Sequence, residues 1–477
     1  MTKESKTIDN TTKEQKEVTI LFAGDSGDGM QLTGGQFTNT SALQGNDIST
    51  FPNYPAEIRA PQGTLAGVSG FQLKFGSTNV YTPGDDYDVL VAMNAAALKK
   101  HLGGLQKGGK LIVNTSGFEK KYLKLAGYED VNPLEDDSLE NYEVYKVDVT
   151  KMTREALKDY DMKRPEKDRC KNMFVLGFLY WMYNRETGET IDFFKEKFKN
   201  KPQIAKANEE VLKAGYNFGD TSETFTTRYE VKAANLPKGV YRNILGNQAV
   251  ALGLVTASRK ANLGLFYGSY PITPASTILH ELSRYKHYGI KTFQAEDEIA
   301  AVCSSIGASF GGNLAVTASS GPGIALKTES LGLVTMLELP LLIFNVQRGG
   351  PSTGLPTKTE QADLIQALEG RNGEAPMPVI APKTPSDCFN KTIEAARFAV
   401  EHMTPVIVLS DGYIANGAEP WRFPSSSDIE PINPPFAENE DIDENNRFKP
   451  YMRNEDFVRK WAVPGKKDFQ HRIGGLE

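Results

Sequence analysis

The residues best placed to do chemistry are two carboxylates in the second half of the chain. Glu296 and Glu298 follow the strand-like run 291–295 and open a helix-like segment. The run before it ends in a turn with two prolines at 270–274, and the run after it ends in a Gly-Pro-Gly turn at 321–323. Parallel α/β sheets bind ligands where such strands end. A carboxylate buried there is a candidate proton handler, because burial and neighbouring charges tune its pKa.

The elements that must position these carboxylates form a regular series. Helix-like segments separate strand-like runs at 263–267, 291–295, 314–318, 341–346 and 405–409. This alternation predicts a doubly wound α/β domain over residues 241–411.

A first α/β domain is predicted over residues 17–218. Its strand-like runs lie at 17–23, 88–92, 110–114 and 142–147, and a densely apolar helix at 172–182 is expected to serve as core or as a subunit interface. The first run enters a glycine-rich turn, Gly24–Gly35, which is either an anion or nucleotide cradle or a tight turn without a ligand. Asp25 and Asp28 would repel phosphate, and the glycine spacing is not the dinucleotide fingerprint. Residues 219–240 lack clear periodicity and are predicted to be a linker.

Composition excludes several functional classes for this chain of 477 residues. A net charge of −6 argues against nucleic-acid binding, and no apolar run approaches a membrane span. The polar segment 1–16 has no signal-peptide core, so we expect a disordered N-terminus and a cytoplasmic protein. Cys170, Cys303 and Cys388 are scattered and the histidines have no metal-like spacing, so we expect no metal site or iron–sulfur cluster. Another chain would then have to carry electrons away.

Four motifs together resemble a known family. They are Tyr270-Pro-Ile-Thr-Pro274, Gln294-Ala-Glu-Asp-Glu298, Thr317-Ala-Ser-Ser-Gly-Pro-Gly323 and the run from Gln347 to Thr357. In this order they resemble the α-subunits of the 2-oxoacid:ferredoxin oxidoreductases. The similarity is greatest to the 2-oxoglutarate type, in which a γ-like domain precedes the α-part. Residues 17–218, with the turns at 24–35 and 60–63, resemble that γ-like, Rossmann-like domain.

The resemblance implies that residues 241–411 form the pyrimidine-binding half of a thiamine diphosphate site. Glu296 matches the position of the carboxylate that activates the cofactor, with Glu298 as the second candidate. The cofactor-binding residues implied by the motifs are Tyr270, Pro271, Ile272, Glu296, Glu298, Ser319 and Gly321. The implied substrate-binding residues are Thr273, Arg348, Ser352 and Thr353, since a permanently charged guanidinium suits the carboxylate of a 2-oxoacid.

The resemblance also implies partners. A β-subunit would contribute the diphosphate contacts, Mg²⁺ and an iron–sulfur cluster, and the complex would be a dimer of α–β units. It would decarboxylate a 2-oxoacid, with 2-oxoglutarate favoured, transfer the acyl group to coenzyme A and reduce ferredoxin. Pyruvate and branched-chain oxoacids remain alternatives, as does a non-catalytic scaffold subunit with a vestigial site. A nucleotide-dependent enzyme using the Gly24 turn is a further possibility.

The end of the chain departs from the family pattern. Residues 412–477 are rich in proline and acidic residues and too short for another packed domain. We therefore expect a partly disordered tail that begins a missing further domain.

Overall fold

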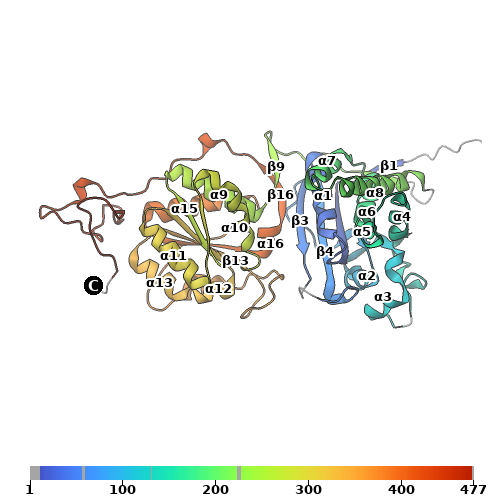
Figure 1. The fold of residues 1–477 in the computed structure, drawn as a ribbon, viewed down its shortest axis with the longest axis horizontal. Helices are drawn as coiled ribbons and strands as arrows, with labels where there is room; N and C mark the ends of the chain where they lie inside the picture. The colour runs from blue at the N-terminus through green and yellow to red at the C-terminus, as the bar shows by residue number, and fades with distance from the viewer. Residues whose placement is uncertain (1–10, 56–59, 130, 223–226, 475–477) are drawn as a thin grey trace, which may run out of the picture. The chain divides into compact units, whose positions relative to one another are not determined.

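The computed structural model describes residues 11–55, 60–129, 131–222 and 227–474. The chain divides into two compact units, Met1–Gly239 and Val240–Glu477. Each unit is a layered α/β structure with its own sheet (Figure 1).

The sheet of the first unit has strand order β3-β4-β2-β5-β6-β7. Its strands are β2 (Glu17–Asp25), β3 (Asp47–Asn53), β4 (Val68–Gly76), β5 (Tyr87–Ala92), β6 (Leu105–Asn114) and β7 (Glu143–Val147). β2 is buried and pairs in parallel with β5, whereas β4 is antiparallel to both β2 and β3. The antiparallel pair β3 and β4 was absent from the predicted strands.

The helices of the first unit pack on this sheet, as the first two do, or on one another. They are α1 (Met30–Leu43), α2 (Ala95–His101), α3 (Lys120–Leu125), α4 (Val149–Ala156), α5 (Arg164–Asp168), α6 (Lys171–Met182), α7 (Gly188–Lys197) and α8 (Pro202–Thr221). α6 is buried from Asn172 to Met182 and contacts α1, α4 and α8, which places it in the core. α8 begins at Pro202, where a missing backbone N–H costs the helix nothing.

A two-stranded ribbon brings the beginning and the end of the first unit together. β1 (Thr11–Glu14) pairs in parallel with β8 (Thr227–Glu230). Both strands lie in segments for which no regular structure was predicted. β8 lies in the expected linker, 219–240, and β1 lies in the N-terminal segment 1–16, which was expected to be disordered. Residues 1–10 of that segment lie outside the described residues.

The sheet of the second unit is fully parallel, with strand order β11-β10-β12-β13-β15-β14. Its strands are β10 (Leu265–Ser269), β11 (Lys291–Gln294), β12 (Leu314–Ser319), β13 (Leu341–Gln347), β14 (Val379–Ile380) and β15 (Pro405–Asp411). Every residue of β12, β13 and β15 is buried, as expected for strands covered on both faces. This is the predicted doubly wound sheet, with the two-residue β14 added.

Helices cover both faces of this sheet. The set is α9 (Gly246–Ala261), α10 (Ser276–Leu282), α11 (Glu298–Phe310), α12 (Gly321–Leu326), α13 (Thr328–Leu337), α14 (Leu364–Glu369), α15 (Asp387–His402) and α16 (Gly412–Asn416). α9 packs on α10 and α15 over one face, and α11 packs on α12 and α13 over the other (Figure 1). A separate two-stranded antiparallel sheet of β9 (Tyr241–Leu245) and β16 (Ala418–Arg422) belongs to the same unit. Short 3-10 turns of the chain lie at Leu65–Gly67, Leu102–Gly104, Thr115–Phe118, Asp137–Leu139, Ser283–Tyr288, Ser426–Asp428 and Asn439–Asp441.

The tail beyond β16 has little regular structure but is packed onto the second unit, in contrast to the expected partial disorder. Trp461 is fully buried in the unit's core cluster, and the Val463 side chain meets Gly312. The buried Arg459 donates hydrogen bonds to the Glu338 and Pro450 carbonyl oxygens at 3.1 and 3.0 Å. These contacts fix the tail beside the loop between α13 and β13.

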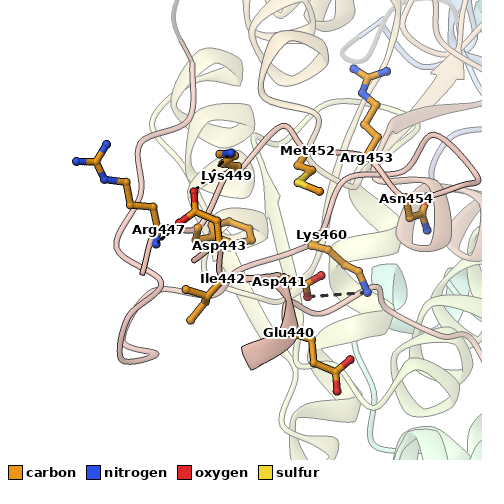
Figure 2. Close-up of a pocket in the computed structure, with 11 residues that line it drawn as sticks. Glu440, Asp441, Ile442, Asp443, Arg447, Lys449, Met452, Arg453, Asn454 and Lys460 are labelled. Carbon is orange, nitrogen blue, oxygen red and sulfur yellow. Dashed lines mark hydrogen bonds and ion pairs between the residues drawn. The ribbon is translucent and has the colours of Figure 1, made fainter. Parts of the chain in front are cut away.

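A cavity of about 250 Å³ within this tail is lined by side chains of both charges (Figure 2). Lys460 lies 4.0 Å from Asp441 and Lys449 lies 3.4 Å from Asp443. These charges pair with each other, so we assign no ligand to this cavity.

Candidate functional site

The predicted site residues gather at the carboxyl edge of the parallel sheet in the second unit. From β10 the chain first forms β11 on one side and then β12 on the other. Doubly wound sheets bind ligands at such a switch of direction, outside the carboxyl ends of the strands.

Of the two candidate carboxylates, only Glu298 is buried at this edge. Asp297 caps α11 by accepting a hydrogen bond from the Ala300 N–H at 2.7 Å, and Glu298 is the first residue of the helix. The Glu298 side chain is 8% exposed, whereas Glu296 lies exposed in the turn before the cap. The N-terminus of α11 favours a negative charge at Glu298. The geometry therefore favours Glu298 over Glu296 as the functional carboxylate.

Glu298 packs against the Gly-Pro-Gly turn that follows β12. A Cβ atom on Gly323 would overlap Ser319 Oγ and would lie 3.1 Å from Glu298 Oε1. A Cβ on Gly321 would lie 2.7 Å from Asp363 Oδ2. The glycines at 321 and 323 therefore leave the space that these polar side chains occupy.

A lysine absent from the predicted site lies beneath this turn. Lys327 is 0% exposed, and its Nζ donates hydrogen bonds to Thr317 Oγ1 at 2.8 Å and to the Ala318 carbonyl oxygen at 3.4 Å. Burial lowers the pKa of Lys327 to about 7, and the charge of Glu298 opposes this shift.

Arg348 joins two loops at the end of β13. Its guanidinium donates to the Thr273 carbonyl oxygen at 2.8 Å and to the Thr353 carbonyl oxygen at 2.7 Å. The side chain is 8% exposed; burial lowers the pKa of Arg348, and the charge of Glu298 opposes that effect. The fork of the guanidinium thus holds both predicted substrate-binding loops in one arrangement.

The remaining predicted residues lie on these two loops. Tyr270, Pro271 and Thr273 are exposed, and Ile272 is half-buried against the core. In the second loop, Ser352 has φ 57° and, like Thr353, is exposed. The Gly350 N–H donates to Glu360 Oε2 at 2.8 Å, which helps to close this loop.

Buried polar atoms without a partner concentrate at the same edge. Within the described part of the chain, the unpartnered atoms here are Ser319 Oγ, Ser320 Oγ, Asn345 Oδ1, Arg348 Nε and Ser410 Oγ. They lie at the ends of β12, β13 and β15. Buried polar groups are normally satisfied, so this cluster suits a polar ligand that brings its own hydrogen-bonding groups.

The structure thus brings Glu298, Ser319 and Gly321 together and links Arg348 to Thr273 and Thr353. Five residues of this edge were not predicted as site residues: Ser320, Gly323, Lys327, Asn345 and Asp363. Asn345 Nδ2 donates to Asp363 Oδ2 at 3.0 Å. Ser320 and Gly323 are small residues that follow a strand, a pattern that indicates a turn. Lys327 lies between two helices, where its sequence position predicts an ordinary solvent-exposed lysine.

The glycine-rich turn of the first unit is filled by its own carboxylates. Asp28 Oδ2 accepts from the Asp25 N–H at 2.9 Å, and Asp28 also pairs with Lys171 at 2.7 Å. Asp25 accepts from the Gly63 N–H, and burial, the largest influence, raises the pKa of Asp25. A cavity of about 290 Å³ adjoins this turn. The carboxylates occupy the place where a cradled phosphate would lie, which disfavours a nucleotide cradle.

Two negative findings concern metals and membranes. Among the described residues, no group of three or more histidine, cysteine or acidic side chains is arranged to hold a metal ion. The described helices also include none that is long and apolar enough to span a membrane.

Comparisons with known proteins identify the family. Residues 259–477 match the family model described as "Pyruvate flavodoxin/ferredoxin oxidoreductase, thiamine diP-bdg", and residues 19–218 match "Pyruvate ferredoxin/flavodoxin oxidoreductase". The chain is 55% identical over 463 residues to the 2-oxoglutarate oxidoreductase subunit KorA of Mycobacterium tuberculosis, covering 97% of this chain and 70% of that protein. The chain belongs to the KorA family of 2-oxoacid:ferredoxin oxidoreductase α-subunits.

Two further KorA-family comparisons extend this result. The 2-oxoglutarate synthase subunit KorA of Archaeoglobus fulgidus is 42% identical over 188 residues, which is 39% of this chain and 53% of that protein. The solved 2-oxoglutarate:ferredoxin oxidoreductase of Magnetococcus marinus matches with a TM-score of 0.82 and 30% identity, over 97% of this chain and 74% of that one. The predicted family and the predicted α/β fold with a thiamine diphosphate-binding domain are confirmed.

Proposed function

We propose that this KorA-family chain, together with a β-subunit, oxidatively decarboxylates 2-oxoglutarate. The products would be succinyl-coenzyme A and CO₂, and the electrons would pass to ferredoxin. In the reaction, the bond between the oxo carbon and its carboxylate breaks, and the sulfur of coenzyme A acquires the oxidised acyl group. The Magnetococcus structure is described with 2-oxoglutarate, coenzyme A and succinyl-coenzyme A bound, which supports this choice of substrate.

The observation that carries the proposal is the buried Glu298 beside unpartnered polar atoms at the strand ends. When bound, thiamine diphosphate supplies the carbon nucleophile for the oxo group and the sink for the electrons left by decarboxylation. Glu298 would hold the aminopyrimidine ring by a hydrogen bond and thereby control its protonation. Ser319 and Gly321 would line the space for the ring, together with Tyr270, Pro271 and Ile272.

The substrate would bind beside Arg348. Its guanidinium already joins the Thr273 and Thr353 loops, so its positive charge is held where a 2-oxoacid carboxylate would enter. Thr273, Ser352 and Thr353 would add hydroxyl contacts. A permanently charged arginine also favours the negative charge that develops after attack on the oxo carbon.

The other parts of the enzyme would come from the β-subunit. Diphosphate contacts, Mg²⁺ and the iron–sulfur cluster are assigned to this partner, as the resemblance to the family implies. We place the complex in the cytoplasm as a dimer of α–β units, with ferredoxin as the electron acceptor.

A first experiment tests the reaction. The complex is purified through a tag on this chain, and viologen reduction is measured with 2-oxoglutarate, pyruvate or a branched-chain oxoacid, each with and without coenzyme A. Reduction that requires both 2-oxoglutarate and coenzyme A is expected. An intact complex that reduces the dye with none of these oxoacids would favour a non-catalytic scaffold subunit.

A second experiment tests the carboxylate assignment with a matched pair of variants two positions apart. Glu298→Gln is expected to lower kcat by roughly 10²–10⁴-fold, the usual contribution of a positioned acid or base. Glu296→Gln is expected to retain most of the activity, because its side chain lies in solvent. The opposite ranking would return the role to Glu296.

A further inference from the structure

The two helix layers that cover the sheet of the second unit differ in the charge of their outer sides. On one face of the sheet, α15 carries the ion pairs Lys391–Glu394 at 2.7 Å and Arg397–Glu401 at 3.2 Å, as expected for a helix that faces water. On the other face, residues 298–337 form α11, α12 and α13 and contain three charged side chains, of which two are buried. The outer side of this second layer therefore lacks the charges that the first layer has.

Apolar and small side chains take the place of charges on the second layer. Glu298 and Lys327 are buried, so Glu329 is the single exposed charge within residues 298–337. We define the α11–α13 surface by five exposed uncharged residues, Ile299, Cys303, Gly307, Leu326 and Leu333. Its three aliphatic side chains are 40–56% exposed. An uncharged, apolar helix layer of this kind is typical of a surface that another protein covers.

The residues of the α11–α13 surface on α11 lie on one side of that helix. Ile299, Cys303 and Gly307 follow one another at intervals of four residues, which places them on the same helix face. Cys303 Sγ lies 3.5 Å from Ser330 Oγ on α13, so the two helices meet beside this face. A Cβ on Gly307 would meet nothing within 4 Å, which leaves the backbone of α11 open to close approach by a partner.

The α11–α13 surface begins at the candidate cofactor site. Glu298 is the first residue of α11, and the exposed Ile299 follows it directly. Ser320, whose Oγ is buried and unpartnered, directly precedes α12. In the proposed function, one cofactor molecule joins this half-site to the diphosphate contacts of the β-subunit. The β-subunit must therefore reach the first turns of α11 and α12, where this surface starts.

We propose that the α11–α13 surface is the docking surface for the β-subunit, which contributes an apolar face of its own. The inference rests on the proposed function, because that function requires the β-subunit. Covering Ile299, Leu326 and Leu333 removes apolar area from water, which favours association. Because the surface has few charges, little hydration of charged groups is lost when the two subunits meet.

Cys303 serves as a probe of this surface in the unmodified protein. It is exposed, whereas Cys170 and Cys388 are buried. The lone chain and the native complex, both kept free of oxygen, are treated with N-ethylmaleimide, and modification of the peptide that contains Cys303 is followed by mass spectrometry. We expect rapid modification in the lone chain and protection in the complex. Equal rates in the two samples would overturn the inference.

Two other patterns of protection would assign the surface to a different occupant and would also overturn the inference. Protection of Cys303 in a monomeric lone chain would mean that the first unit of the same chain covers the surface. Protection that develops only as the lone chain is concentrated, together with a dimer in sedimentation, would mean that a second copy covers it.

A matched pair of variants tests the surface without reference to cysteine. Leu333 on α13 and Phe398 on α15 are 40% and 41% exposed, so glutamate is tolerated at either position in the lone chain. Leu333→Glu is expected to raise the dissociation constant for the β-subunit by roughly 30-fold or more, because the complex would bury an unpaired charge. Phe398→Glu is expected to bind as wild type. Equal dissociation constants for the two variants would contradict the proposed docking surface.

The same samples separate this inference from the proposed function. A complex in which Cys303 is protected but which reduces no dye with any oxoacid would support the docking surface and refute the proposed function. A complex that is active with 2-oxoglutarate and in which Cys303 still reacts as in the lone chain would refute the docking surface and leave the proposed function intact.

Discussion

The substitution Gly323→Ala tests whether the turn after β12 shapes the space for Glu298. The added methyl group would overlap Ser319 Oγ and would lie 2.9 Å from Glu298 Cγ. Neither neighbour moves freely, since Ser319 is fully buried and Glu298 begins α11. The methyl group must therefore displace the carboxylate or the turn.

The size of the effect follows from this overlap. Forcing a methyl group into a packed site costs about 1–3 kcal/mol, which corresponds to a fall in Tm of roughly 2–12 °C for a unit of this size. Displacing a reacting group by about 1 Å can cost about 10²-fold in rate. We expect Gly323→Ala to lose about that factor in kcat and to bind thiamine diphosphate more weakly.

A matched glycine in the neighbouring helix provides the control. Gly332 lies inside α13, and a Cβ placed on it would meet nothing within 4 Å. Gly332→Ala is expected to raise stability by about 0.5–1 kcal/mol and to leave kcat unchanged, because alanine favours a helix interior. Thermal unfolding and dye-reduction kinetics of both variants decide the matter. A Gly323→Ala enzyme with the stability and kcat of Gly332→Ala would refute the packing argument.

Three further predictions concern other parts of the second unit. Arg348→Lys is expected to raise the KM for the oxoacid by roughly 10- to 150-fold, the equivalent of one hydrogen bond to a charged group, since an ammonium cannot bridge the Thr273 and Thr353 carbonyl oxygens; an unchanged KM would contradict this role. Arg459→Met is expected to lower stability by about 1–3 kcal/mol and to expose the tail to limited proteolysis, because it leaves two partly buried carbonyl oxygens without their hydrogen-bond donor. Wild-type resistance to protease would contradict this prediction. For Lys327, burial lowers the pKa in the folded protein to about 7, below the ordinary value of 10.5. Between these two values the unfolded chain binds more protons than the folded one, so stability rises with pH there. Chemical unfolding should show that Lys327→Met lacks this contribution, roughly 1.4 kcal/mol per pH unit at most, and equal slopes for the two proteins would contradict it.

The regular part of the fold followed from hydrophobic runs, and the exceptions have identifiable causes. The predicted strands β12, β13 and β15 are buried on both faces, which produces a continuous apolar signal. β3 gives a weaker signal because it contains Pro52, which a sheet tolerates at its edge, and β3 is an edge strand. β4 contains Gly70, which weakens the strand pattern. The tail is fixed by long-range contacts such as those of Trp461, which no local pattern reveals.

The candidate site was predictable to the level of motifs and not to the level of each side chain. The motif contains two carboxylates two positions apart, and the helix cap determines which of them is buried. Asp297 closes the helix start, so Glu298 falls on the buried side and Glu296 remains outside. No sequence pattern predicted the burial of Lys327, because this burial depends on how α12 packs against β12. Arg348 was predicted, but its hydrogen bonds to two loop carbonyl oxygens required the folded loops.

The ribbon of β1 and β8 joins the two ends of the first unit. Because Thr11–Glu14 pairs with Thr227–Glu230, both ends of this unit meet at one place. Domains whose ends are adjacent are readily moved between genes, fused or supplied as separate polypeptides. A gene divided at residue 219 would encode β8 in a different polypeptide from β1. A division after Gly239 keeps both strands of the ribbon in one polypeptide. The junction at which evolution or an engineer can separate the two units therefore lies past the ribbon.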